Sequence, residues 1–407
     1  MIFFKNAQYT GSKNRLSLFD LTIPKNFNGE LILFIHGYMG FKDWGAWDLF
    51  GKSFEHQGFG FCKFNMTHNG GTIENGLDFP DLEAFAFNTY SKEISDVSFL
   101  LTHLEKELNP LPNIHLIGHS RGGCIALLTA ADKRITTVTT LSGISSITRR
   151  YEDKEMLKKW KETGVRYVTN QRTKQALPHY YVQYLDFIEN QETLNIEKAC
   201  KTLTKPNLVI HGDSDVSVPL SEGNEIANWT NSPLHIIEEA DHVYGSNHPW
   251  TQTILPKGLA EVVGIISSFI VMNNPIYLSE NNEIIKQLID FSQLENGIKE
   301  VGFDFLIDLA KQLGLSKKEL IGLFDKNNHT NTPTSESNRI IQFYRLCLMS
   351  NIDHKITQEE LTNLRNIAIS MGLSPMATEE VIKYLKENPG KCIPTNQLLQ
   401  LFQANHN

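Results

Sequence analysis

Short apolar runs alternate with helical patterns over roughly the first 272 residues, which predicts a parallel β-sheet covered by helices. The predicted strands are residues 31–37, 58–66, 113–120, 135–143, 206–215 and 234–242. Between the second and third, apolar side chains at positions 94, 97, 101, 104 and 108 follow the spacing of an amphipathic helix. Because the strands are almost continuously apolar, we expect the sheet to be buried on both faces.

Residues from about 144 to 200 break this rhythm. The stretch "RRYEDKEMLKKWKETG" predicts a charged helix, and the stretch "ALPHYYVQYLDFIENQ" is rich in aromatic residues. An insertion at the end where two strands finish would lie over a site there as a cap. It could also be a surface excursion in which Tyr180, Tyr181, Tyr184 and Phe187 pack on the core, and the two interpretations are compatible.

After about residue 272 the pattern is helical only and contains an internal repeat. The stretches "NGIKEVGFDFLIDLAKQLGLS" and "HKITQEELTNLRNIAISMGLS" align in constant register, with Leu306 on Leu364 and Gly314 on Gly372. Each copy ends in Gly-Leu-Ser, a glycine stop followed by a serine that can cap the next helix. We therefore predict an α/β domain over residues 1–275, with a small cap insertion at about 144–200, and an all-helical repeat domain over residues 276–407.

Composition narrows the functional classes. The 407 residues are 41% hydrophobic and 21% charged with a net charge of −8, so there is no basic surplus to bind nucleic acid. The first residues lack a secretory leader, and the longest apolar run, "EVVGIISSFIVM", is too short to span a bilayer. We expect a cytoplasmic protein without a membrane partner. The five scattered cysteines predict free buried thiols rather than disulfides or a zinc site.

The stretch "LIGHSRGG", residues 116–123, joins a predicted strand to a predicted helix and carries candidate chemistry. A serine hydroxyl must project clear of the backbone to attack a carbonyl carbon, and a sharp strand-to-helix turn presents it in this way. Gly118 and Gly122 provide the room for that turn, because side chains there would collide with neighbouring elements. Ser120 is therefore the candidate nucleophile.

An acid and a base follow in the order expected for a hydrolytic triad. Asp215 lies in the loop after the strand "PNLVI", and His242 lies in the loop after the strand "LHIIEE". We predict that His242 is the general base and that Asp215 orients its imidazole. Asp213 is the main rival for the acid, and Asp241 a lesser one because an acid adjacent to a histidine rarely points at its ring.

Backbone donors for the oxyanion are predicted at Tyr38, in the glycine-bearing turn after the strand "LILFI", and at Arg121, directly after the nucleophile. Two other histidines invite a catalytic role. His36 precedes the turn and is expected to be a buried packing residue, and His119 is expected to be a structural neighbour or a wall of the pocket.

Residues 1 to about 272 resemble the α/β-hydrolase family. The stretches "HGYMGFKDWG", "FNMTHNG", "DLEAFAFNTYSKEISDV" and "GHSRGG" are most similar to bacterial acyl-esterase and cinnamoyl-esterase-like members, related to the serine aminopeptidase and dienelactone hydrolase types. This resemblance implies an eight-stranded, mostly parallel sheet, no metal or cofactor, and hydrolysis through an acyl-enzyme.

The helical repeat resembles the tellurite-resistance TerB-like domain, over about residues 276–407. The turn "NIDHKITQEE" in the second copy is similar to a cation-binding loop, but Lys355 stands where an oxygen ligand is needed and no bidentate glutamate closes a calcium loop. We expect no metal there.

The function predicted from these features is hydrolysis of a small carboxylic ester, with a protein partner possible through the helical domain. A peptidase or an acyltransferase could use the same triad, because the leaving group and the acceptor are not chosen by the triad. A non-catalytic sensor that binds a ligand on the hydrolase fold is the alternative outside enzymes.

Overall fold

The computed structural model describes residues 1–274, 358–387 and 395–404, with the single positions 336, 339, 340, 343, 344, 347 and 393. Its contacts divide the chain into two compact units, Met1–Ile270 and Val271–Asn407.

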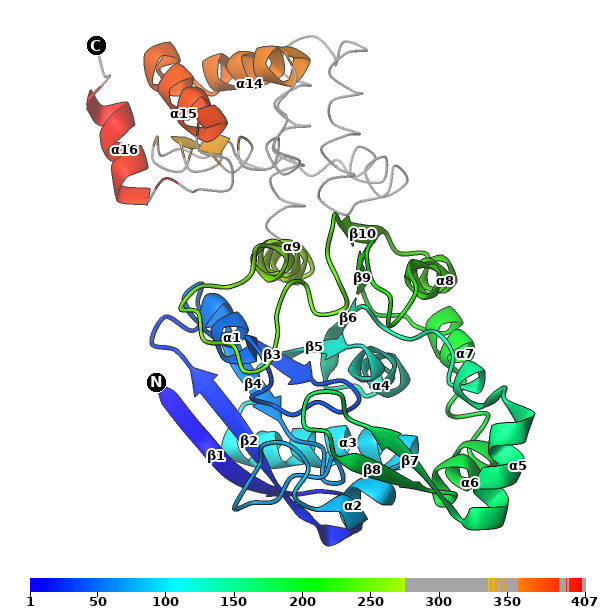
Figure 1. Cartoon of the computed structure of the whole chain (residues 1–407). Coiled ribbons are helices and arrows are strands. Elements are labelled where there is room, and N and C mark those ends of the chain that lie inside the picture. The colour runs from blue at the N-terminus through cyan, green and yellow to red at the C-terminus, as the bar shows by residue number, and fades with distance from the viewer. Residues whose placement is uncertain are drawn as a thin grey trace. The chain divides into compact units, whose positions relative to one another are not determined.

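An eight-stranded sheet forms the centre of the first unit (Figure 1). Its strands are β1 (Ile2–Thr10), β2 (Leu16–Ile23), β3 (Glu30–Ile35), β4 (Gly60–Phe64), β5 (Asn113–His119), β6 (Ile135–Leu141), β9 (Asn207–Gly212) and β10 (Leu234–Ile237). Their order is β1-β2-β4-β3-β5-β6-β9-β10. β2 runs antiparallel to both β1 and β4, and the other five strand pairs are parallel, so the expected mostly parallel eight-stranded sheet is confirmed.

All six strands predicted from the apolar runs are present. The N-terminal pair β1 and β2 was not among them, and β1 shows why. Its pairing with β2 shifts register between Phe4 and Ala7, and Asn6 in between has a positive φ of 52°. This bulge interrupts the alternation of side chains by which a strand is recognised.

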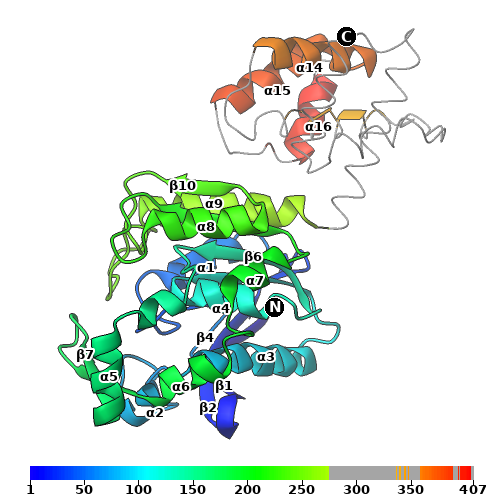
Figure 2. The same ribbon diagram turned by 90° about the vertical axis from the view of Figure 1, so that its right-hand side faces the viewer.

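Alternating side chains of the central strands are buried in two separate cores, one on each face of the sheet. This explains why the strands are continuously apolar. On one face Leu31, Leu33 and Leu116 pack against helices α3 (Tyr90–Glu107), α4 (Arg121–Thr129), α7 (Ile196–Lys201) and α8 (Leu220–Thr230). On the other face Ile32 and Phe34 pack against α1 (Trp47–Glu55) and α9 (Lys257–Met272) (Figure 2). The predicted helix with apolar residues at 94–108 is α3, and it covers the first of these faces.

The insertion between β6 and β9 contains η2 (Thr148–Tyr151), α5 (Lys154–Thr163), the antiparallel hairpin β7 (Val165–Thr169) and β8 (Ala176–Tyr180), α6 (Val182–Glu189) and α7. The charged helix expected here is α5. It begins where Asp153 accepts a hydrogen bond from the N–H of Met156 and ends at Gly164, whose φ is 70°. Of the four aromatic residues weighed as packing on the core, Phe187 is buried in it and Tyr184 packs against it partly buried, while Tyr180 and Tyr181 are not part of this core.

In the second unit, the described helices are α14 (Gln358–Ser370), α15 (Pro375–Glu387) and α16 (Thr395–Ala404), which share a buried core. The second repeat copy ends as predicted, with Gly372 at a φ of 68° and with Ser374 accepting a hydrogen bond from the N–H of Ala377. The first repeat copy and Lys355 lie outside the described residues, and the TerB-like identity of this region stays a prediction.

The described residues bear on two expectations, free buried cysteines and the absence of a membrane-spanning helix. Cys62, Cys124, Cys200 and Cys347 are free and buried as predicted, while Cys392 lies outside the described residues. Among the described helices, none has both the length and the apolar composition needed to cross a membrane.

We predict that a fragment ending at Asn274 folds by itself, because both cores on the sheet are built from residues before that point. Thermal unfolding followed by circular dichroism should give one cooperative transition. A fragment ending at Pro256 is the control. It lacks α9 and the buried Leu259, Val262 and Ile266, so it should lose most of its stability. A longer fragment that is insoluble or melts without cooperativity would contradict this division of the chain.

Candidate active site

Ser120 lies at a sharp turn between β5 and α4, in the backbone conformation φ 56°, ψ −120°. A non-glycine residue with positive φ is strained, and such strain persists only where the surrounding structure holds it. Here the N–H of Ser120 donates to the carbonyl of Leu141 at 2.8 Å, and its carbonyl accepts from the N–H of Gly123 at 2.9 Å. The turn is therefore fixed through the serine backbone, and the hydroxyl is not used to hold it.

Two glycines permit this turn for steric reasons. A Cβ on Gly118 would overlap the backbone of Gly122, and a Cβ on Gly122 would overlap the carbonyl oxygen of Ile35 on β3. Both obstacles are backbone atoms, which cannot rotate away as a side chain could. The strand, the helix and the neighbouring strand thus approach one another closely at Ser120.

Asp215 and His242 come together from the loops that follow β9 and β10. His242 Nδ1 donates to Asp215 Oδ2 at 2.7 Å, which leaves His242 Nε2 as the acceptor. The other oxygen, Asp215 Oδ1, accepts from the N–H groups of Ser217 at 2.8 Å and Val218 at 2.9 Å. The Asp215 side chain is inaccessible to solvent, so this carboxylate is held rigidly against the imidazole.

Hydrogen bonding keeps Asp215 ionised in this buried position. Burial alone would raise the pKa of its carboxyl, but the donors from His211, His242 and the N–H of Val218 hold that pKa far below its usual range. His211 is fully buried, and its Nε2 lies 3.5 Å from Asp215 Oδ2. A permanent negative charge therefore faces His242 Nδ1 and would stabilise a protonated imidazole.

Neither rival acid contacts the imidazole. Asp213 is exposed, and its Oδ1 accepts from the hydroxyl of Ser214. Asp241 is also exposed and accepts from the N–H groups of Val243 and Gly245. Among the three acids weighed from the sequence, only Asp215 meets His242.

His119 connects the imidazole loop to the nucleophile turn. Its Nε2 donates to the carbonyl of His242 at 2.8 Å, and the two rings lie 4.8 Å apart. Burial, and then the neighbouring His242, lower the pKa of His119 to about 3, so it stays neutral. His119 is thus a structural neighbour, as expected.

In the described structure, Ser120 and His242 do not share a hydrogen bond. Catalytic hydrogen bonds often tighten only when substrate binds.

The two predicted oxyanion donors lie on different elements, Tyr38 in the loop after β3 and Arg121 at the start of α4. A Cβ on Gly37 would lie 3.0 Å from Ser120 Cβ, so this loop packs directly on the serine. Among the described residues, the backbone N–H groups of Tyr38 and Arg121 have no hydrogen-bond partner. His36 is buried, accepts from the N–H of Met66 and donates to the carbonyl of Gly37, which fits the packing role expected for it.

A family model described as alpha/beta hydrolase fold matches residues 30–180, which contain β3, the serine turn and the first part of the insertion. The chain has the α/β-hydrolase fold. No curated protein matches the sequence.

Solved structures agree with this fold. A putative hydrolase from Agrobacterium vitis S4 aligns with a TM-score of 0.51 and 14% identity, covering 66% of this chain and 100% of that one. The alpha/beta hydrolase GrgF from Penicillium sp. sh18 aligns with a TM-score of 0.51 and 14% identity, covering 66% of this chain and 98% of that one. Est1E from Butyrivibrio proteoclasticus with bound ferulic acid aligns with a lower TM-score of 0.48 and 21% identity, covering 65% of this chain and 98% of that one. At such identities, the two structures with a TM-score of 0.51 show the fold alone.

The insertion contacts the loop after β3, which carries the predicted donor Tyr38. The hydroxyl of Tyr38 donates to His179 Nε2 on β8 at 2.7 Å, because His179 Nδ1 already donates to the carbonyl of Leu177. Met39 packs against a small buried cluster of Phe79, Phe85 and Leu177. His179 was not predicted from the sequence, since nothing local indicates a partner 141 residues away from it.

A pocket of about 500 Å³ opens at the root of the insertion, beside Ile147, Tyr184, Phe187 and Trp229. Ser120 and His242 do not line it. This pocket therefore lies apart from the serine turn.

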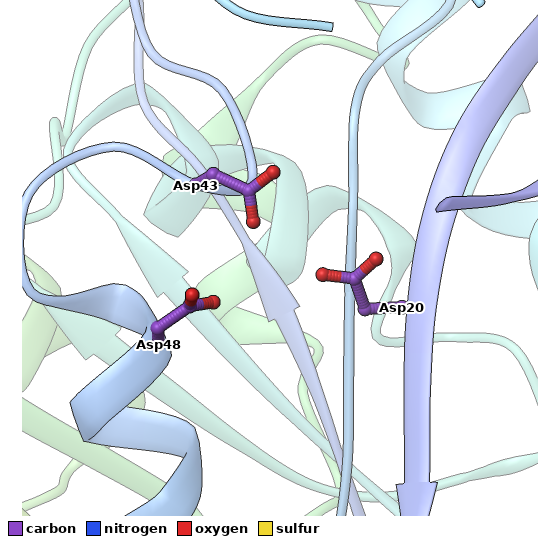
Figure 3. A group of neighbouring side chains, drawn as sticks. All are labelled: Asp20, Asp43 and Asp48. Atoms are coloured by element: carbon purple, nitrogen blue, oxygen red, sulfur yellow. The ribbon is translucent and has the colours of Figure 1, made fainter. Parts of the chain in front are cut away.

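Among the described residues, one group of three carboxylates is close enough to hold a metal ion: Asp20 on β2, Asp43 after β3 and Asp48 on α1 (Figure 3). Three lysines contact it: Lys5, Lys42 and Lys63. Lys42 Nζ lies 2.9 Å from Asp20 and 2.6 Å from Asp43, and Lys63 bonds Asp43 and Asp48. Three ammonium groups balance the three carboxylates, so this donor set does not fit a metal ion.

We predict that Gly118→Ala and Gly122→Ala disrupt the serine turn, because the added methyl groups meet backbone. Displacing the turn by about 1 Å should lower any hydrolytic kcat/KM about 100-fold or more. Gly264→Ala is the matched control. It lies exposed on α9 with open space around a Cβ, so it should keep activity and gain up to about 1 kcal/mol in helix stability. Equal behaviour of the three variants would contradict the steric argument.

Proposed function

We propose that this α/β-hydrolase-fold protein is a serine hydrolase that cleaves a small carboxylic ester through an acyl-enzyme. The observation that carries the proposal is the 2.7 Å hydrogen bond between His242 Nδ1 and the inaccessible, ionised Asp215. This bond fixes the imidazole tautomer whose Nε2 can accept a proton. His242 is in turn bound to His119, the residue preceding Ser120.

The chemistry follows from these positions. Ser120 Oγ attacks the ester carbonyl carbon while His242 Nε2 takes the hydroxyl proton. The N–H groups of Tyr38 and Arg121 donate to the tetrahedral oxyanion, and as that intermediate collapses the protonated His242 gives its proton to the leaving alkoxide. Water then attacks the acyl-enzyme while His242 takes its proton. The bond to Ser120 Oγ breaks, His242 returns the proton to Oγ, and the acid is released, with Asp215 ionised throughout.

The resemblance of the sequence to acyl-esterase members of the fold favours an ester over an amide. Parallel assays with p-nitrophenyl esters and aminoacyl p-nitroanilides separate the two, since the same triad serves both. Faster turnover of the amides than of the esters would contradict the esterase proposal and favour a peptidase.

For residues 276–407 we propose a separate helical domain that binds a protein partner. The buried core shared by α14, α15 and α16 supports an independently packed unit. All the proposed catalytic groups precede this region.

We predict that a fluorophosphonate probe labels the protein at Ser120, which peptide mass spectrometry would locate. Ser120→Ala should abolish labelling and lower ester turnover about 10⁴- to 10⁶-fold. The fold should survive, because the serine holds the turn through its backbone. Residual activity above about 1% of the parent protein would exclude Ser120 as the nucleophile.

We predict that kcat/KM falls on acidification, because a general base must be unprotonated to accept the serine proton. Neither neighbour of His242 can produce this fall between pH 5 and 8, because the pKa of Asp215 lies far below its usual range and that of His119 is about 3. In Asp215→Asn the imidazolium loses its anionic partner, so the fall should move to lower pH, and the rate at neutral pH should drop about 10⁴-fold. Asp213→Asn, which changes an exposed acid, is the control. A flat profile over this range would argue against a histidine base.

A further inference from the structure

Arg166 lies on the hairpin of the insertion, directly beside His179, which binds the hydroxyl of Tyr38. In the β7–β8 pairing Arg166 is opposite His179. Side chains of opposite residues lie on the same face of a hairpin, so Arg166 shares the face of His179. The next residue, Tyr167, is 64% exposed and lies on the other face. The guanidinium therefore belongs to the face of the hairpin that meets Tyr38.

Arg166 differs from the other arginines of residues 1–274 in its partners. Six of the seven arginines there pair with a carboxylate: Arg15 with Asp81, Arg121 with Glu93, Arg134 with Asp132, Arg149 with Glu225, Arg150 with Glu222 and Arg172 with Asp78. Within this part of the chain Arg166 has no carboxylate partner. Its Nη1 contacts the sulfur of Met156 at 3.2 Å, and its buried Nε has no hydrogen-bond partner.

Aromatic contacts fix the place of this guanidinium. Its Cζ lies 4.2 Å from the centre of the buried Trp160 ring. Trp160 Nε1 donates to the carbonyl of His179 at 2.7 Å, and His179 Nε2 accepts from the Tyr38 hydroxyl at 2.7 Å. A continuous set of contacts thus leads from Arg166 to the residue whose N–H is proposed to bind the oxyanion.

Two guanidinium groups act on His179, those of Arg166 and Arg121. The Arg121 guanidinium, the other one at this site, is neutralised by Glu93 at 2.8 Å. Burial, and then the charge of Arg166, lower the pKa of His179 to about 4, so this ring is neutral. The site therefore presents one uncompensated positive charge, which suits a singly charged anion.

We propose that Arg166 binds an ionised carboxylate of the substrate, so that the preferred esters are half-esters of dicarboxylic acids. This inference rests on the proposed ester hydrolysis. A guanidinium donates two parallel hydrogen bonds to a carboxylate, and the half-buried Arg166 has no such partner within residues 1–274. Its contact over the Trp160 ring holds the charge in place without using an N–H group.

The test compares monomethyl adipate with dimethyl adipate, which have the same chain and differ in one negative charge. Hydrolysis is followed by acid release in a pH-stat, with the full chain. We expect a higher kcat/KM for the half-ester. Arg166→Gln should lower that value about 10- to 100-fold and change the value for the diester less than about threefold. Arg166→Lys should recover part of the loss, because the charge remains without the planar fork.

Arg172→Gln is the matched control, since Arg172 lies on the turn of the same hairpin and pairs with Asp78. It should leave the preference for the half-ester unchanged. No preference in the parent protein, or equal losses for both esters in Arg166→Gln, would overturn the proposal. The preference of the parent protein and the result for Arg166→Lys decide the matter even if Arg166→Gln does not fold.

A binding measurement separates this proposal from the proposed function. Calorimetry with monomethyl adipate on Ser120→Ala needs no turnover, and adding Arg166→Gln should weaken binding about 10-fold or more. If no ester is cleaved and no fluorophosphonate labels Ser120, the hydrolase proposal fails, while this binding difference would still support the carboxylate site. Binding that is undetectable, or equal in both proteins, would overturn the carboxylate site alone.

Discussion

The close approach of three backbone segments at Ser120 is the constraint on which the rest of the site depends. β5, α4 and the end of β3 meet where Gly118 and Gly122 leave no room for side chains. This contact holds Ser120 at positive φ, and the loop after β3 packs on the serine at Gly37, the residue before Tyr38. The strain of the turn is opposed by packing of the sheet on both faces, so the geometry belongs to the whole domain.

The electrostatics of the site also depend on backbone donors. Asp215 remains ionised without solvent because each of its oxygens is bound, one by two N–H groups and the other by His242. A buried carboxylate with fewer donors would take up a proton and could no longer orient the imidazole. The loops after β9 and β10 therefore supply both the charged groups and the peptide groups that keep them charged.

The sequence predicted what local patterns encode. The six apolar strands follow from continuous apolar runs, and the serine turn follows from glycine spacing between a strand and a helix. The preference for Asp215 over Asp213 rested on chain order, and the geometry of the His242 ring agrees with it. In contrast, the hairpin β7–β8 and its partners were not predicted. Arg166 is distinctive only because the six other arginines of residues 1–274 pair with carboxylates. These pairs exist only in the folded chain and cannot be recognised from the sequence around one residue.

Tyr38 connects the loop after β3 to the insertion, because it follows Gly37, which packs on Ser120, and its side chain binds His179. The hydroxyl donates to His179, which is neutral at working pH since its pKa is about 4, so the bond persists as the medium changes. His179 is in turn fixed by Trp160 through its own carbonyl. A displacement of the hairpin would therefore shift Tyr38, whose N–H is the proposed oxyanion donor. With Arg166 as the proposed carboxylate site, one hairpin would both select the substrate and position a donor for the reaction, so the two proposals are mechanically linked.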